Sequence, residues 1–182
     1  DALEKLYSGN CRVKQDILDA LQAAGKDLMC QDAPSELSLS FIDRDIGDEG
    51  AEAFADVLAS GHCPEGLRLS LEFENSGIGE KGAQALARAL KSGKCHLGLR
   101  LNLSINGIGD QGAQALADAL ASGKCPPKLQ LFLADNEIGD KGAQALAKAL
   151  ASGKCPSELD LWLFHNKGYG RFGNGTQALA QA

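Results

Sequence analysis

The stretch LFLADNEIGDKGAQALAKALASGKC, residues 131–155, decides how this chain folds. Its GAQALA segment, Gly142–Ala147, also occurs at Gly82–Ala87 and at Gly112–Ala117, so successive copies start 30 residues apart. A unit of that length is one supersecondary element, which cannot bury its apolar face without stacking on its neighbours. The sequence therefore predicts a modular repeat scaffold whose activity lies on the surface that the stack creates.

One unit of the repeat is predicted to be a short strand followed by a helix. Leu131 and Leu133 alternate with other residues, which is the pattern of a strand with one buried face. Asp140 is predicted to cap the N-terminus of the helix with its side-chain oxygen. Leucine and alanine then recur at helical spacing up to Leu150, and Gly153 is predicted to end the helix in a left-handed conformation.

The same frame runs through most of the chain and predicts five strands and about five helices. We expect residues 1–30 to form an N-terminal helical cap and residues 31–166 to form the repeats. Residues 167–182 depart from the frame and are predicted to be an irregular C-terminal cap or a truncated repeat. Within the repeats, Arg44 and Ser76 stand where later units have Asn106 and Asn136.

The frame Leu-x-Leu-x-x-Asn-x-Ile-Gly-Asp-x-Gly-Ala-x-Ala-Leu-Ala-x-Ala-Leu resembles the ribonuclease-inhibitor-like subfamily of leucine-rich repeats. The near-identity of the units and their Ser-Gly-Lys-Cys-Pro link are similar to leucine-rich-repeat effectors secreted by intracellular bacteria, and to the repeats of NOD-like receptors. This resemblance implies an α/β solenoid, a horseshoe segment with a parallel sheet on its concave side and helices on its convex side. It also implies that the Asn side chain bonds the backbone of adjacent turns, so the units at Arg44 and Ser76 should be looser.

Composition argues against several classes of partner. The net charge is −6, and Lys and Arg are scattered along the chain, whereas nucleic acids and anionic membranes attract clustered basic residues. No run of apolar residues approaches the roughly 18 that a membrane span needs. We therefore expect neither nucleic acid nor a membrane as partner, and we expect a monomer.

Four of the six cysteines recur with the repeat, at Cys63, Cys95, Cys125 and Cys155. We interpret this position as a small buried apolar site, and stacked thiols favour a reducing, intracellular compartment. If the bacterial resemblance holds, that compartment is the host cytoplasm, reached by secretion. No Cys-x-x-Cys motif or Cys/His cluster accompanies these residues, so we expect no metal and no other cofactor.

The buried leucines leave the intervening strand residues on the concave face. With strands ~4.8 Å apart, four gaps make a platform about 19 Å across, which suits another protein better than a small metabolite. Aromatic residues gather towards its C-terminal end, and exposed rings beside charges are typical of binding hot spots. The alternative is that these rings pack beneath Tyr169–Phe172 as a cap, or on further repeats. The residues predicted to bind a partner are Glu72, Glu74, Arg100, Asn102, Phe132, Asp135, Asp160, Trp162, Phe164 and His165.

The sequence offers little for catalysis. Asp135 and His165 are predicted to lie close together on adjacent strands, but their column supplies no nucleophile, and two solvated polar residues are the simpler interpretation. The leading hypothesis is a non-enzymatic scaffold that binds a partner protein, which would be a host protein if the chain is a bacterial effector. The alternatives are a steric enzyme inhibitor, as the ribonuclease-inhibitor resemblance implies, and a GTPase activator of the Ran type.

Overall fold

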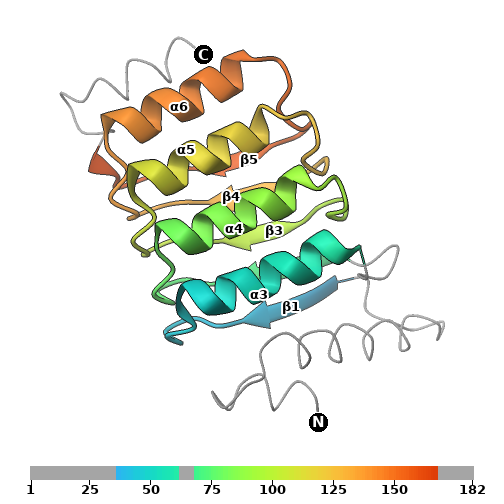
Figure 1. The fold of residues 1–182 in the computed structure, drawn as a ribbon, viewed down its shortest axis with the longest axis vertical. Helices are drawn as coiled ribbons and strands as arrows, with labels where there is room; N and C mark the ends of the chain where they lie inside the picture. Colours follow the sequence, from blue (N-terminus) through green and yellow to red (C-terminus); the bar gives the residue numbers. More distant parts are fainter. Residues whose placement is uncertain (1–35, 62–67, 168–182) are drawn as a thin grey trace.

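The described part of the chain is a stack of strand–helix units. The computed structural model describes residues 36–61 and 68–167, so the predicted N-terminal cap and nearly all of the predicted C-terminal cap lie outside it. Five strands and four helices alternate along this part of the chain (Figure 1). They are β1 (Glu36–Ser40), α3 (Gly47–Ser60), β2 (Arg68–Glu72), α4 (Glu80–Lys91), β3 (Arg100–Asn102), α5 (Gly109–Leu120), β4 (Gln130–Phe132), α6 (Asp140–Ala151) and β5 (Asp160–Trp162).

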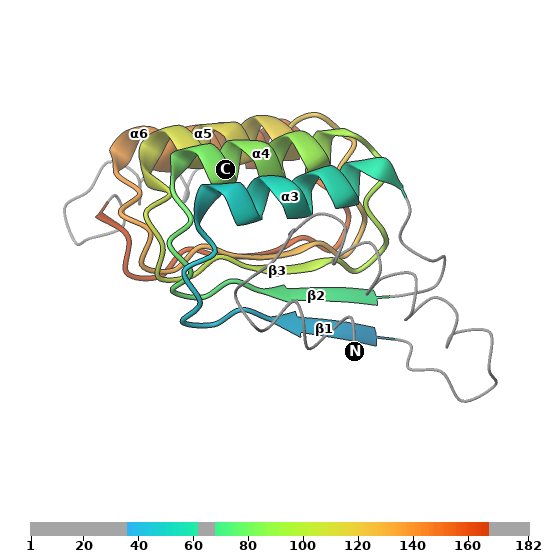
Figure 2. The same cartoon turned by 60° about the horizontal axis from the view of Figure 1, so that its bottom comes forward.

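The five strands form one parallel sheet in the order of the sequence, as predicted. The four helices lie side by side on one face of this sheet (Figure 2). The opposite face carries no described helix and holds the side chains predicted to lie on the concave side; we call it the helix-free face. None of the described helices has the length and apolar run that a bilayer crossing requires.

The core lies between the sheet and the helices and is built from one leucine column after another. Leu71, Leu101 and Leu131 occupy matching places on β2, β3 and β4, and each is fully buried. Leu161 continues the column on β5 but is only half-buried, because no described unit follows to cover it. The apolar surface of each unit is therefore removed from water by its neighbour, which is the source of stability in a solenoid.

The glycine of the GAQALA segment permits close packing of neighbouring helices. A Cβ atom on Gly82 would lie 2.9 Å from the Cβ of Ala51 on α3, and one on Gly142 would lie 2.9 Å from the Cβ of Ala113 on α5. Real side chains do not approach so closely. The repeated glycine is therefore explained by the helix spacing that the stack imposes.

A column of asparagine side chains joins the turns, as the resemblance implied. Asn106 Oδ1 accepts hydrogen bonds from the backbone N–H groups of Ser76 and Ile78, and Asn106 Nδ2 donates to the Phe73 carbonyl at 2.7 Å. Asn136 and Asn166 make the same kinds of bond one and two units further on. In the same column, the Ser76 side chain reaches the preceding turn through a single hydrogen bond, from Oγ to the Phe41 carbonyl.

The start of α6 differs from the prediction that Asp140 caps this helix. Gly139 is the N-cap of α6, Asp140 is already the first helical residue, and no side chain caps that position from within the same unit. The cap comes instead from the unit before, where Asp110 Oδ1 accepts the N–H groups of Gly139 and Gly142 at 2.8 Å each. Asp48 caps α4 in the same way, through Gly79 and Gly82.

The helix starts also alternate along the stack, although their sequences are nearly identical. Before α4 and α6, Gly79 and Gly139 are extended and receive the aspartate cap. At the start of α3 and α5, Gly47 and Gly109 have φ near +60° and donate their N–H groups to the carbonyls of the next turn. Glu80 stands where its neighbours in the stack have aspartate, and none of its described contacts caps α5. The described units are therefore joined in two capped pairs.

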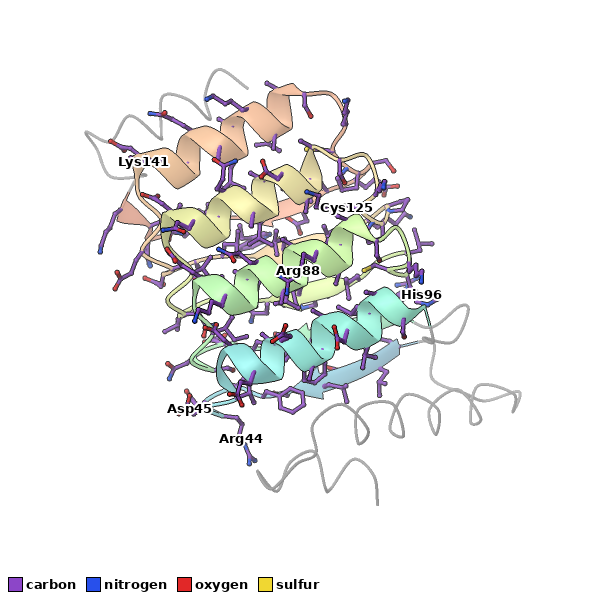
Figure 3. The ribbon with its side chains drawn as sticks, in the orientation of Figure 1. Arg44, Asp45, Arg88, His96, Cys125 and Lys141 are labelled. Carbon is purple, nitrogen blue, oxygen red and sulfur yellow. The ribbon has the colours of Figure 1, made fainter. Side chains whose placement is uncertain are left out.

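The repeated cysteines are partly as expected. Cys125, labelled in Figure 3, is buried, whereas Cys95 and Cys155 are only half-buried, which corrects the expectation that the whole position is sealed. Each thiol donates to a carbonyl in the last turn of the preceding helix, as in Cys125 Sγ to Ala119 O at 3.3 Å. Burial, with a smaller contribution from Cys155, raises the pKa of the Cys125 thiol to about 11. Cys63 lies outside the described residues.

Candidate functional site

The helix-free face presents three rows of side chains, because residues two apart on a strand point to the same side. The strand register places matching residues of successive units side by side. The first row is Ser70, Arg100, Gln130 and Asp160, and the second is Glu72, Asn102, Phe132 and Trp162. The third row follows from the backbone hydrogen bonds beyond the strands and contains Glu74, Ser104, Ala134 and Phe164.

Arg100 connects the polar side chains of this face, around Glu72, with its aromatic side chains, which begin at Phe132. Its Nε donates to Glu72 Oε1 at 2.8 Å, and its guanidinium carbon lies 4.1 Å from the centre of the Phe132 ring. Gln130 Oε1 accepts a second, longer hydrogen bond of 3.3 Å from the same guanidinium. A guanidinium held between a carboxylate and a ring face has little rotational freedom, so this part of the surface is pre-organised.

The polar part is more tightly connected than the sequence suggested. Glu72 accepts hydrogen bonds from Arg100, Asn102 and Ser70, and Asn102 Nδ2 also reaches Glu74 Oε2. Burial raises the pKa of Glu72, but the hydrogen bonds from Arg100, Asn102 and Ser70, and the positive charge of Arg100, outweigh burial and hold it below its ordinary value of 4.5.

Asn102 was predicted to be exposed on this face, and this is wrong. Asn102 is 7% exposed and Ser70 is 3% exposed, because both lie beneath the carboxylates to which they donate. They are therefore residues that orient Glu72, whereas Glu72, Glu74 and Arg100 are half-buried and reach the surface.

The aromatic part is a continuous row across β4 and β5. The Phe132 and Trp162 rings lie 5.4 Å apart, and Phe164 contacts Trp162 edge-on at 5.6 Å. Trp162 is 44% exposed and Phe164 is 62% exposed, and the indole N–H donates to Asp160 Oδ1 at 2.6 Å. We call Phe132, Asp160, Trp162 and Phe164 the aromatic surface.

A hollow of about 730 Å³ adjoins the aromatic surface at β5. The half-buried core residues Leu161 and Leu163 line it together with Leu150 of α6, and Trp162, Phe164 and His165 complete the wall. It wraps the outer edge of β5, the side on which a following repeat or a partner would pack.

Asp135 and His165 do lie close together, as their shared column predicts. His165 Nδ1 is 3.4 Å from Asp135 Oδ2, but the two side chains are 80% and 46% exposed, so water screens the interaction. No group of three His, Cys, Asp or Glu residues in the described ranges is arranged to hold a metal ion.

This column has a backbone feature that sequence reasoning missed. Its members are all left-handed, with φ between 50° and 57°: Asp43, Asn75, Ile105, Asp135 and His165. Their side chains pair across turns at both ends, where Asn75 Nδ2 donates to Asp43 Oδ1 at 2.7 Å and His165 meets Asp135. Aspartate and asparagine tolerate this conformation, and their recurrence in the column was the available signal. Ile105 lies between the two pairs, and isoleucine does not tolerate the left-handed conformation in this way.

Comparison with known proteins agrees with the repeat pattern. A family model described as Leucine Rich repeat matches residues 45–55, 99–117 and 127–147. No curated protein matches the chain. Domains of this family generally bind other proteins and are typically not enzymes. The matches fall on units whose strands form one parallel sheet with helices on one side, so the described part of the chain has the α/β solenoid fold of leucine-rich repeats.

Proposed function

We propose that this chain is a non-enzymatic scaffold that binds a partner protein on its helix-free face. The observation that carries the proposal is the exposed aromatic row that ends in Trp162 and Phe164. Exposed large aromatic side chains that are ordered by contacts to each other supply contact area at low entropic cost. Arg100, fixed between Glu72 and Phe132, borders the row with a pre-organised polar region.

The surface is suited to a protein more than to a small molecule. The rows run across four strands, β2 to β5, and the hollow at β5 is open to one side of the sheet. Binding energy would concentrate on the aromatic surface, and the surrounding polar residues would form a rim.

The experiment is site-directed capture followed by affinity measurement. A photo-crosslinking amino acid at position 164 would trap the partner, which is then identified and purified. Calorimetry would compare the wild type with Trp162→Ala and Phe132→Ala, for which we expect affinity losses of about 30-fold, the usual effect of removing a hot-spot residue. Leu97→Ala is the matched control, because Leu97 is 58% exposed but lies outside the three rows.

Melting temperatures distinguish aromatic residues that bind a partner from aromatic residues that cover the end of the solenoid. Trp162→Ala should leave the melting temperature almost unchanged if Trp162 contacts a partner. If Trp162→Ala and Phe132→Ala both unfold the β5 end of the solenoid, the rings are cap residues and the proposal is wrong.

The finer proposal is that the chain is a ribonuclease-inhibitor-like effector that acts as a monomer on a host protein. Its support is the near-identity of the units and the Ser-Gly-Lys-Cys-Pro link. The thiols of Cys125 and Cys155, which form no disulfide in the described part of the chain, support action in a reducing compartment. Capture with host-cell lysate and with lysate of unrelated cells tests this, and equal capture from both would contradict it.

A steric inhibitor is the second candidate, favoured by the carboxylates of the helix-free face. Arg100 neutralises Glu72, but Glu74 and Asp160 have no described cation beside them. A basic enzyme would be attracted, and its association rate would fall as salt is added. An association rate that does not depend on salt would exclude this mode.

A further inference from the structure

Arg100 shows how this face holds a cation. Its guanidinium donates to the Glu72 carboxylate at 2.8 Å and covers the Phe132 ring at 4.1 Å. One carboxylate and one aromatic face therefore satisfy both the charge and the flat surface of the guanidinium.

The same two groups recur on β5 without a cation. Asp160 lies beside Trp162, whose indole N–H it accepts through Oδ1, so Oδ2 has no partner among residues 36–61 and 68–167. Trp162 is 44% exposed, and Phe164 stands edge-on beside it. Within those ranges, Arg100 over Phe132 is the one cation found above an aromatic ring.

The charges nearby favour a positive group at this place. Asp160 is on the first row of β5, and Asp135 follows β4 with only His165 against it. Arg100 is already matched to Glu72. Lys167, the last described residue, pairs with Glu137 at 3.0 Å. This end of the face is therefore acidic, and the Trp162 and Phe164 side chains are exposed there.

We propose that Asp160, Trp162 and Phe164 bind an arginine side chain of the partner protein. This inference rests on the proposed function and specifies the partner's chemistry. The guanidinium would lie over the indole and donate to Asp160 Oδ2, while the methylene stem would contact Phe164. Arginine is preferred over lysine because a planar guanidinium stacks on a ring while it still donates to a carboxylate at its edge.

Trp162 is the only tryptophan in the chain, so its fluorescence reports on this site alone. The probe is an acetylated, amidated Gly-Ser-Arg-Ser-Gly peptide, with versions that replace arginine by lysine or by uncharged citrulline. We expect saturable quenching with millimolar affinity for the arginine peptide, about threefold weaker binding of the lysine peptide, and no saturation with citrulline. Equal responses to arginine and citrulline, or no saturable response to arginine, would overturn the proposal.

The variant Asp160→Asn tests the carboxylate, because asparagine keeps an oxygen for the indole N–H and removes the charge. We expect it to weaken the arginine peptide about fivefold. Asp118→Asn is the matched control: it removes one charge from an exposed residue of α5, where Gln114 donates to it, and should change nothing. Unchanged binding by Asp160→Asn, with an unchanged melting temperature, would refute the proposal.

The captured partner separates this inference from the proposed function. If Trp162→Ala abolishes partner binding while Asp160→Asn does not alter it, the arginine site is wrong and the scaffold proposal stands. If neither Trp162→Ala nor Phe132→Ala alters partner binding, the helix-free face is not the binding surface, and both proposals fail.

Discussion

Asp110 caps the helix of the unit that follows its own, where its Oδ1 accepts the backbone N–H of Gly142 at 2.8 Å. The same oxygen accepts from Gly139, so one carboxylate satisfies two of the unpaired donors at the start of α6. It also places a negative charge at the positive end of that helix. The carboxylate that caps α6 therefore also joins two successive units.

Asp110→Ala should lower the free energy of unfolding by about 1–2 kcal/mol, because two donors lose their acceptor. Chemical denaturation measures the loss. Glu80→Ala is the matched control, since Glu80 has the same place in its unit but no described capping contact. We expect a change of less than about 0.5 kcal/mol for it, and equal losses in the two variants would refute the inter-unit cap.

Asn136→Ala should be more destabilising, by about 2–4 kcal/mol. Asn136 is fully buried and donates to the carbonyls of Leu103 and Ala134, which would be left unsatisfied. Ser76→Ala, at the matching place, loses one such bond and should cost about 1 kcal/mol. Denaturation curves compare the two, and a larger loss at Ser76 would contradict the reasoning.

Ile105→Asn should stabilise the protein by about 1 kcal/mol. Ile105 has φ of 55°, and a β-branched residue in this conformation costs roughly 1–2 kcal/mol, whereas asparagine adopts it readily. Asparagine would also stand next to Asn75 and Asp135, the members of the column on either side. Thermal unfolding checks this against Ile42→Asn, which changes an isoleucine of similar exposure with no left-handed backbone. A lower melting temperature for Ile105→Asn would be the contrary result.

Glu72→Gln should remove a pH-dependent part of the stability. Because the folded pKa of Glu72 lies below its ordinary value of 4.5, its contribution is present above that value and is lost as the pH falls through the folded pKa. The wild type should therefore melt at a higher temperature than Glu72→Gln at pH 7, and the gap should be smaller at an acidic pH below 4.5. Glu158→Gln, at an exposed pair with Lys128, should show little gap at either pH. A gap for Glu72→Gln that does not narrow as the pH falls below 4.5 would contradict this assignment.

The periodicity of the sequence was sufficient to predict the architecture. Leu71, Leu101 and Leu131 align because each unit repeats one frame, and a parallel sheet in sequence order is what stacking such units produces. The asparagine bonds and the left-handed Gly153 were also predicted and are confirmed. Exposure of Trp162 and Phe164 followed from the alternation of each strand.

The details that the sequence did not reveal depend on contacts between units. Asp140 was predicted to cap its own helix, since a local rule cannot tell an acceptor for its own helix from one for the next. Asn102 was expected to be exposed, because alternation assigns a side to a residue but does not show that Glu72 and Glu74 cover it. The position of Arg100 between Glu72 and Phe132 likewise depends on three different strands.

The two alternating helix starts have a consequence for changing the length of this array. Asp48 and Asp110 each tie a unit to its successor, while Glu80 makes no such tie. Deleting one unit would bring together two units whose helix starts do not match, one with and one without an aspartate cap from its neighbour. Deleting two successive units would restore the original junctions. Engineered versions that are shortened or extended by pairs should therefore retain cooperative unfolding better than those altered by an odd number.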